Sequence, residues 1–317
     1  MHLRGPDRRT TLRGAVGAFA AVAVGGCAWR EPSPTPSVLV VATGPPGAVY
    51  REIGAEIARL LDERLPHTRV ETVETGASHD NLRLISTGEA HLGLANLDSV
   101  LADESAGGSA SLRAVGRLYD SFVHLVVLDA SPVRRLADLE GRRVSVGAHN
   151  SGTEFTMERL LAETGVSPEV VRLDQAVSAR ALGDGEIDAM FSLTGLPTPA
   201  IADLAERHVI RLVDLSEAAD EMADTHPEAY FPAGIPATTY EGVSACPTMS
   251  VPNLLLCSAE LPEDLVHTVT DTVYTRAGQI AASRPEAAQI NVRTGISTGV
   301  VPLHRGAVRW YRENKPS

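Results

Sequence analysis

Aromatic and basic residues are scarce in this chain of 317 residues. Only 4% of the residues are aromatic, so Val, Leu, Ile and Ala must supply most of any core. Lys and Arg number 28 against 40 Asp and Glu, and the net charge of −12 argues against a nucleic-acid binder, which needs a basic face. Hydrophobic residues still make up 44% of the chain, and its length favours two domains over one.

Motifs of common metal and phosphate sites are also missing. The sequence contains no H-x-x-x-H pair and no C-x-x-C pair. The loop at 147–152 is not a phosphate-binding Walker loop, because no lysine follows it. We therefore expect a protein that is not an enzyme and that needs neither a metal nor another cofactor.

A hydrophobic run long enough to cross a membrane is absent from the N-terminus. The apolar run 14–26 is too short to span a bilayer as a helix, and it lies between Arg8-Arg9 and Cys27. This order resembles a twin-arginine export signal with a lipobox, so residues 1–26 are predicted to be a signal peptide. Cys27 would then carry a lipid that anchors the exported protein to the outer face of the cell membrane. A plain signal peptide with an incidental cysteine is the alternative.

Residues 27–37 follow this signal and contain three prolines in alternation. Alternating prolines favour an extended, semi-rigid chain. We predict a tether that holds a folded body a short distance from the anchor.

One stretch, residues 144–154, combines a short apolar strand, a loop of small polar residues and a helix start. Gly147 permits a sharp turn after the strand, and Ser151 or Thr153 can cap a helix that runs to Gly165. Free backbone amides and the positive end of a helix dipole at such a junction suit an anion such as a carboxylate. Taken alone, the stretch is equally compatible with an ordinary capped turn.

The same design appears twice more along the chain, in the loops 44–50 and 75–81. Each loop follows an apolar strand and leads into a helix. Ligands of open α/β sheets bind beyond the carboxyl ends of the strands, where all three loops are expected to lie. Three such loops in one chain therefore indicate a binding site for a small ligand.

Strands and helices alternate through most of the sequence, which predicts an α/β fold with a mostly parallel sheet. Apolar runs at 122–128 and 248–257 are predicted to cross between two lobes. On this basis lobe I comprises residues 38–128 and 250–317, and lobe II comprises residues 129–249.

Two cysteines remain if Cys27 is lipidated. Cys246 and Cys257 belong to a protein that is predicted to be exported into an oxidising compartment, so a disulfide between them is one interpretation. Two separately buried thiols are the other, because Cys257 ends an apolar strand, where a free cysteine packs well.

An ordered series of short motifs resembles the TAXI family, the substrate-binding proteins of tripartite ATP-independent periplasmic (TRAP) transporters. The resemblance runs from about residue 38 to residue 313. The motifs are Ala42-Thr-Gly44, Gly47-Ala-Val-Tyr50, Thr75-Gly-Ala-Ser-His-Asp-Asn81, Gly88-Glu-Ala-His-Leu-Gly-Leu-Ala95, Asp138-Leu-Glu-Gly-Arg-Arg-Val-Ser-Val-Gly147, Ser151-Gly-Thr-Glu154, Gly183-Asp-Gly-Glu-Ile-Asp-Ala-Met-Phe191, Pro302-Leu-His-Arg-Gly-Ala307 and Trp310-Tyr-Arg-Glu313.

Four of these motifs depart from the pattern of that family. Residues 47–50 replace the usual Gly-Thr-Tyr-Tyr, Ala77 replaces a glycine, Asn150 replaces a glycine, and Arg305 stands where proline is usual. The changes in the predicted ligand loops bear on which ligand is bound.

The resemblance implies a two-lobed fold of the type II periplasmic-binding-protein kind, with a hinge and a central ligand cleft. It implies a receptor that captures glutamate or a related carboxylate by lobe closure and delivers it to a TRAP-type membrane permease, and we expect a monomer. A ligand-sensing lipoprotein that signals to a membrane kinase is the alternative function.

The residues expected to bind the ligand come from both lobes. Asp98 is expected to receive an ammonium group, and the backbone of Gly195 is expected to approach the ligand. The full set is Tyr50, Ser78, Asn81, Asp98, Ser151, Gly152, Thr153 and Gly195.

Overall fold

The computed structural model describes residues 35–46, 48–105 and 111–314. The predicted signal peptide, the lipidation site Cys27 and most of the predicted tether lie outside these residues. No helix in the described ranges combines the length and the apolar character that crossing a bilayer requires.

The described chain forms a ten-stranded mixed sheet in which the central strands are antiparallel. Its order is β2-β1-β3-β10-β4-β7-β5-β6, with β8 paired to β4 and β9 paired to β10. The strands are β1 (Val38–Ala42), β2 (Arg69–Val73), β3 (Leu92–Asn96), β4 (Leu112–Leu128), β5 (Arg143–Ser145), β6 (Glu169–Val171), β7 (Ala189–Thr194), β8 (Ile210–Leu212), β9 (Phe231–Ile235) and β10 (Cys246–Ser258).

Two long strands, β4 and β10, join the two halves of this sheet. Strand β10 pairs with β3 in lobe I through residues 253–257 and with β9 in lobe II through residues 246–250. Strand β4 pairs with β10 over residues 112–122 and with β7 over residues 122–126. The sheet therefore passes into lobe II near Phe122, which begins the run 122–128.

The sequence predicts a mostly parallel sheet, and the structure corrects this. Strands β2, β1 and β3 run parallel, as do β6, β5 and β7. The crossing strands β4 and β10 run antiparallel to each other and to their outer neighbours. The mixture follows from a chain that crosses between the lobes once in each direction.

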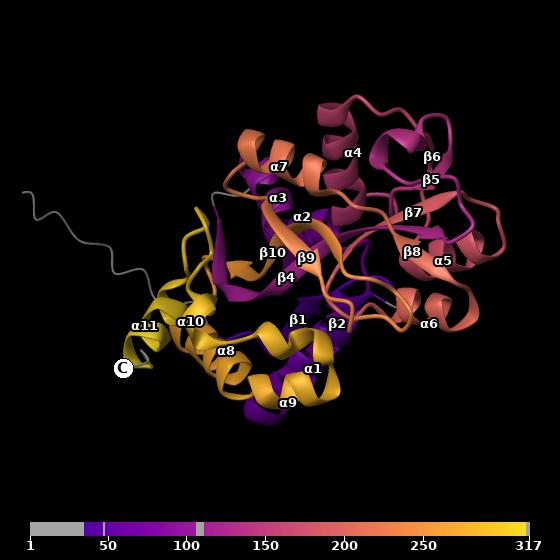
Figure 1. Cartoon of the computed structure of the whole chain (residues 1–317). Helices are drawn as coiled ribbons and strands as arrows, with labels where there is room; N and C mark the ends of the chain where they lie inside the picture. Colours follow the sequence, from indigo (N-terminus) through magenta and orange to yellow (C-terminus); the bar gives the residue numbers. More distant parts are fainter. Residues whose placement is uncertain (1–34, 47, 106–110, 315–317) are drawn as a thin grey trace, which may run out of the picture. The chain divides into compact units, whose positions relative to one another are not determined.

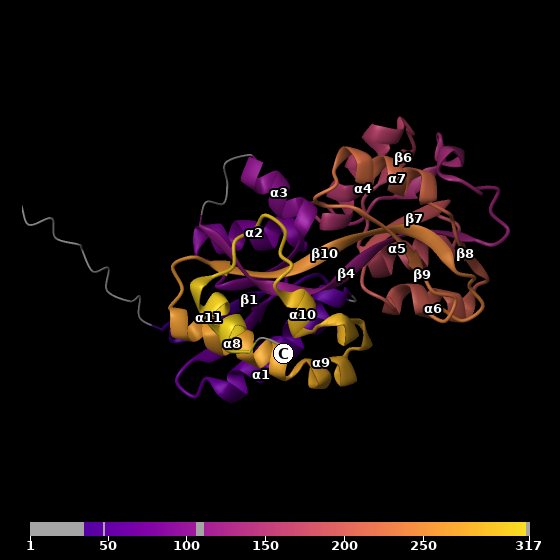
Figure 2. The same cartoon turned by 60° about the vertical axis from the view of Figure 1, so that its left-hand side comes forward.

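Helices cover both faces of the sheet (Figures 1 and 2). They are α1 (Val49–Arg64), α2 (Ser78–Thr87), α3 (Leu97–Ser105), α4 (Gly152–Thr164), α5 (Gln175–Gly183), α6 (Pro199–Arg207), α7 (Ser216–Thr225), α8 (Glu263–Thr275), α9 (Ala277–Ser283), α10 (Val292–Gly295) and α11 (Arg305–Glu313), with 3₁₀ turns η1 (Leu136–Leu139) and η2 (Pro285–Gln289).

The cores on the two faces of the sheet differ. On one face a single shared core runs through both lobes and includes Leu82 of α2, Leu97 of α3, Met157 of α4 and Met222 of α7. On the other face the core of lobe I, built on α1, α8 and α11, is separate from that of lobe II, built on α5 and α6. The lobes therefore pack continuously on one face and are divided on the other.

Helices α8 and α9 meet at Arg276 and do not form one continuous helix. Gly278 lies in the first turn of α9, and a glycine weakens a helix by about 1 kcal/mol relative to alanine.

Of the two interpretations of Cys246 and Cys257, the structure supports separately buried thiols, because both cysteines are free and buried. They lie at opposite ends of β10, where an extended chain at about 3.3 Å per residue separates them by roughly 30 Å or more. A disulfide needs Cα atoms within about 7 Å of each other.

Candidate functional site

A pocket lies where loops from both lobes meet beyond the carboxyl ends of the strands. Its volume is about 60 Å³. A single water needs roughly 10–15 Å³ on the same measure, so the pocket has room for a few waters or one small molecule. The described residues that line it are Pro45, Ala48, Val49, Tyr50, Gly76, Ala77, Asn96, Tyr119, Ser121, Gly147, Ala148, Ser151, Gly152, Thr153, Asp174, Gln175, Phe191, Ser192, Leu193 and Thr194.

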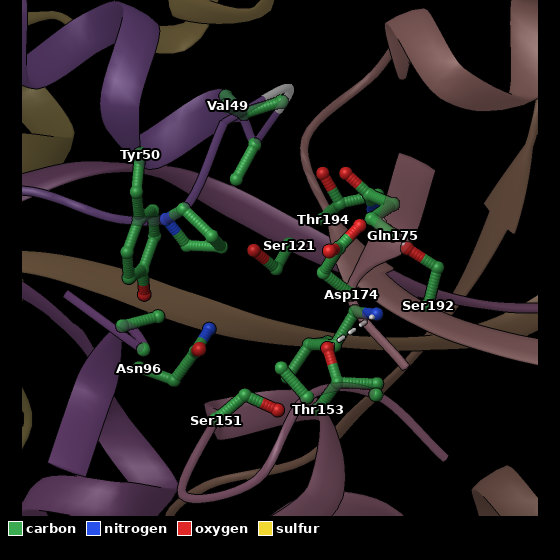
Figure 3. A pocket seen from close by; sticks show the side chains of 18 of the residues that line it. Val49, Tyr50, Asn96, Ser121, Ser151, Thr153, Asp174, Gln175, Ser192 and Thr194 are labelled. Atoms are coloured by element: carbon green, nitrogen blue, oxygen red, sulfur yellow. Dashed lines mark hydrogen bonds between the residues drawn. The ribbon is translucent and has the colours of Figure 1, made fainter. Parts of the chain in front are cut away.

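Asn253, a fully buried residue of β10, organises the polar wall of lobe I. Its Oδ1 accepts hydrogen bonds from the Tyr50 hydroxyl and, at 3.0 Å, from Asn96 Nδ2. Its Nδ2 donates to Ser121 Oγ at 2.8 Å. One buried amide thus holds three pocket-lining side chains in place. Tyr50 and Asn96 lie on one side of the pocket and Ser121 lies at its centre (Figure 3).

The wall of lobe II begins at the first turn of α4. The Ser151 hydroxyl caps this helix by accepting from the Glu154 amide at 3.1 Å. Among the hydrogen bonds of the described residues, the Gly152 and Thr153 amides have no acceptor, as expected for the first turn of a helix. Thr153 Oγ1 accepts from the Leu193 amide at 3.2 Å, which ties α4 to β7 beside the pocket.

The two lobes touch at two glycines that flank this pocket. A methyl group added at Gly152 would lie 2.5 Å from Asn96 Oδ1 and 2.8 Å from Ser78 Oγ. One added at Gly195 would lie 3.0 Å from Tyr119 Cε2 and 3.3 Å from Val49 Cγ1. Gly152 therefore approaches lobe I more closely than any residue with a side chain allows, and Gly195 leaves little room for one, so the two lobes are closed on each other here.

Helix N-termini from both lobes converge on the pocket. The starts of α1 and α2 contribute Val49 and Ala77, and those of α4 and α5 contribute Gly152 and Gln175. Each N-terminus carries a partial positive charge and unpaired amide groups. The twenty lining residues include no Lys, Arg or His, so these helix ends are the pocket's sources of positive potential.

Two lining residues carry buried polar atoms that have no partner among the described residues. They are the Tyr119 hydroxyl and Gln175 Oε1. The Gln175 amide is held from its other end, because Nε2 donates to Ser192 Oγ. Burial raises the pKa of the Tyr119 phenol well above its usual value, and Tyr50 and Glu286 add to this effect. Unpaired buried polar groups are unfavourable, and a ligand in the pocket is a natural partner for them.

Four of the eight residues expected to bind a ligand line this pocket, namely Tyr50, Ser151, Gly152 and Thr153. All three loops singled out in the sequence contribute to the lining. Their contact with a ligand remains a prediction.

Ser78 and Asn81 do not line the pocket but support it from behind. Ser78 Oγ exchanges hydrogen bonds with the amide and Oδ1 of Asn96, each at 3.1 Å. Asn81 Nδ2 donates to the Thr43 and Leu94 carbonyls at 2.7 Å. Both side chains are fully buried with their partners, so in this structure they position neighbouring elements, and their contact with a ligand stays a prediction.

Asp98 does not line the pocket either. Its carboxylate is fully buried, and it accepts from the Ser99 amide at 2.7 Å, Thr156 Oγ1 at 2.6 Å and the Tyr230 hydroxyl at 2.9 Å. Burial raises the pKa of this carboxyl, while the hydrogen bonds from Thr156 and Tyr230 oppose the rise. Asp98 therefore joins α3 of lobe I to α4 and Tyr230 of lobe II and is not placed to receive an ammonium group in the pocket. Gly195 lies against Tyr119 and Val49 of lobe I and is not among the lining residues.

Several polar lining residues were not predicted from the sequence, including Asn96, Ser121, Asp174, Gln175 and Ser192. Asp174 caps α5 and Gln175 is its first residue, and the junction between β6 and this helix lacks the glycines that mark the other three loops. Ser121 and Ser192 lie within strands β4 and β7, where no sequence pattern marks a residue as part of a pocket. Within the described residues, no three His, Cys, Asp or Glu side chains come together as a metal site.

Solved structures of periplasmic binding proteins share this fold. The alkanesulfonate-binding protein SsuA from Xanthomonas axonopodis pv. citri, bound to MOPS, is 21% identical with a TM-score of 0.53, over 90% of this chain and 86% of that one. A Xanthomonas citri protein bound to ATP is 14% identical with a TM-score of 0.52, over 87% and 95%. A mutant of ArgBP from T. maritima is 13% identical with a TM-score of 0.51, over 80% and 95%.

These likenesses establish the fold. The chain has the mixed α/β architecture of periplasmic binding proteins, which confirms the predicted fold class. A family model described as the NMT1-like family matches residues 41–314, which include both lobes and every residue of the pocket. The chain therefore belongs to the NMT1-like family.

Proposed function

We propose that this chain is the extracytoplasmic solute receptor of a TRAP-type secondary transporter and that it captures a small carboxylate by lobe closure. The observation that carries this proposal is the closed pocket at the lobe junction, with buried polar atoms that lack partners. A molecule that fills the pocket contacts both lobes at once, so it binds the closed form better than an open one and shifts the population toward it.

The proposed anionic group of the ligand lies at the first turn of α4. The Gly152 and Thr153 amides and the dipole of this thirteen-residue helix favour a carboxylate there. The Ser151 hydroxyl lies at this turn and can donate to the same group, and Ser121 lies at the centre of the pocket (Figure 3). The resemblance to the TAXI family supports glutamate and related dicarboxylates as candidates, all of which share this group.

The remaining parts of the proposal concern the membrane. The TAXI resemblance supports a TRAP-type permease as the partner, and the lipobox at Cys27 supports a lipid anchor on the outer face of the cell membrane. Recovery of the exported chain in the detergent phase on Triton X-114 partitioning tests the anchor. Ligand uptake by a TRAP-type permease in vesicles, with and without the purified chain, tests the partner.

The receptor role is tested by blocking closure. Gly152→Ala places a methyl group against Asn96 and Ser78, so we expect the ligand affinity to fall by roughly 100-fold, about 2.7 kcal/mol. Isothermal titration calorimetry against a panel of amino acids, hydroxy acids and dicarboxylates measures this loss.

The matched control for this substitution is Gly278→Ala in α9, where no atom lies within 4 Å of an added methyl group. This variant should bind like the wild type. The proposal is wrong if nothing on the panel binds, or if Gly152→Ala binds a ligand as tightly as Gly278→Ala does.

A further inference from the structure

Asp174 is the only charged residue among the twenty that line the pocket. It caps α5, and its Oδ1 accepts from the Val177 amide at 2.8 Å. No ion pair of Asp174 occurs within the described chain, and its side chain is only partly buried. The carboxylate therefore faces the pocket with acceptor capacity to spare and no cation to match it.

Gln175 and Ser192 extend this acceptor side of the pocket. Because Gln175 Nε2 donates to Ser192 Oγ, the buried Oε1 is left without a partner. Asp174, Gln175 and Ser192 lie together on the side of the pocket away from Tyr50 and Asn96 (Figure 3). One region of the pocket thus offers acceptors, whereas the first turn of α4 offers donors.

Asp174 is the one charge that the described lining residues bring to the acceptor side. A second carboxylate on the ligand would approach Asp174 without an Arg or Lys in the lining to separate the two charges. In a partly buried site, such like-charge contact is unfavourable.

We propose that the ligand is a neutral zwitterion whose carboxylate lies at the first turn of α4 and whose ammonium group donates to Asp174 and Gln175. This inference rests on the proposed receptor function and narrows its ligand class. It moves the ammonium site from Asp98, which is already fully hydrogen-bonded, to Asp174. It also excludes dicarboxylates and disfavours amino acids with an acidic side chain.

Matched pairs of ligands that differ only in the amino group provide the test. Calorimetry compares alanine with lactate and serine with glycerate, and adds glutamate, glutarate and succinate as acidic probes. We expect the amino acid of each pair to bind more tightly than its hydroxy acid, and the three acidic probes to bind more weakly than the neutral amino acids.

Asp174→Asn removes the charge but keeps an oxygen that caps α5, so the helix start is preserved. Loss of one partner from a desolvated charge pair should weaken amino-acid binding by roughly 30-fold or more and leave hydroxy-acid binding nearly unchanged. Asp184→Asn is the control, because this exposed residue follows the same helix and lies outside the pocket.

Tighter binding of hydroxy acids or dicarboxylates than of amino acids would overturn the inference, as would unchanged amino-acid affinity in Asp174→Asn. Either result, combined with loss of binding in Gly152→Ala, leaves the receptor function in place and removes only the zwitterion. If no probe binds and Gly152→Ala changes nothing, the receptor proposal fails and this inference fails with it.

Discussion

Two polar clusters lie between the lobes, and they differ in whether their members have partners. The Asp98 cluster, formed by Asp98, Thr156 and Tyr230, lies within the shared core, and every buried oxygen in it is hydrogen-bonded. The pocket contains Asp174, Gln175 and Tyr119, and the described chain leaves polar atoms of the latter two unpaired. Both clusters bring an aspartate of one lobe near residues of the other.

Polar groups that have partners within the chain stabilise the fold, whereas those without partners are available to a ligand. A buried carboxylate with three donors contributes to the folded state, because the same donors would be left unpaired without it. A buried hydroxyl or amide oxygen without a partner reduces stability and is retained where a ligand completes it. The shared core continues through the first cluster, whereas the separate lobe cores flank the second. We therefore expect lobe motion to open the pocket while the Asp98 cluster stays closed.

The largest effect is expected at Asp98. Asp98→Ala leaves the Ser99 amide and the Tyr230 hydroxyl without their acceptor in a fully buried site, so the free energy of unfolding should fall by about 4 kcal/mol. Urea denaturation followed by circular dichroism measures this change.

Asp98→Asn is the matched variant because it keeps one acceptor oxygen, and it should lose less than half as much stability. If alanine is tolerated as well as asparagine, the Asp98 cluster does not hold the lobes together, and the contrast with the pocket is lost.

A third buried group, His124, also has both of its polar atoms occupied. Its Nδ1 donates to the Phe122 carbonyl at 2.9 Å, and its Nε2 accepts from the Tyr240 hydroxyl at 2.9 Å. Burial lowers the pKa of this imidazole to about 4, although backbone hydrogen bonds oppose the change. His124 therefore belongs with the partnered groups.

The pH dependence of stability tests this assignment. Between pH 6.5 and 4 the unfolded imidazole binds a proton that the folded one does not, so stability present above pH 6.5 is lost as the pH falls. The loss from this residue should reach about 3 kcal/mol. His124→Asn should remove this part of the slope, which appears as the difference between the two stability curves from pH 7 to pH 4. Parallel curves would show that folding does not change the pKa of His124.

The sequence predicted the two-lobe architecture better than the pairing within the sheet. The three predicted loops follow β1, β2 and β5 and lead into α1, α2 and α4, as the sequence indicates. Alternation cannot reveal that β4 and β10 are antiparallel, because both faces of these long strands are buried and their order in the sheet depends on distant partners. The two interpretations of Cys246 and Cys257 likewise could be separated only by the fold, which places both thiols on one strand.

The site was predicted where glycine-rich loops mark it and missed where strands supply it. Loop composition identifies the first turn of α4, because small residues and caps follow from local geometry. Whether a buried polar side chain has a partner depends on the tertiary fold, which is why Asp98 was assigned to the ligand and Asp174 was overlooked. Both are aspartates near a helix start, and only their neighbours distinguish them.

The smallest effects are expected from Tyr230→Phe and Tyr119→Phe, each of which removes one hydroxyl group. The Tyr230 hydroxyl donates to Asp98 and accepts from Arg159 at 3.2 Å, so Tyr230→Phe should lower the free energy of unfolding by about 1.5 kcal/mol with unchanged ligand affinity. The Tyr119 hydroxyl is buried and unpaired in the described chain, so Tyr119→Phe should leave stability unchanged or slightly raised. Its ligand affinity should instead fall by roughly 10-fold, because a hydrogen bond formed only with the ligand is lost.

Thermal unfolding and calorimetry on the same two variants measure both quantities. A crossed result, with stability lost at Tyr119 and affinity lost at Tyr230, would reverse the roles of the two clusters. If the two variants changed stability and ligand affinity equally, the presence or absence of a hydrogen-bond partner would not distinguish the two clusters. We expect Tyr230→Phe to lose stability alone and Tyr119→Phe to lose ligand affinity alone. The Tyr230 hydroxyl has its hydrogen-bond partners in the folded protein, whereas the proposed partner of the Tyr119 hydroxyl is the ligand.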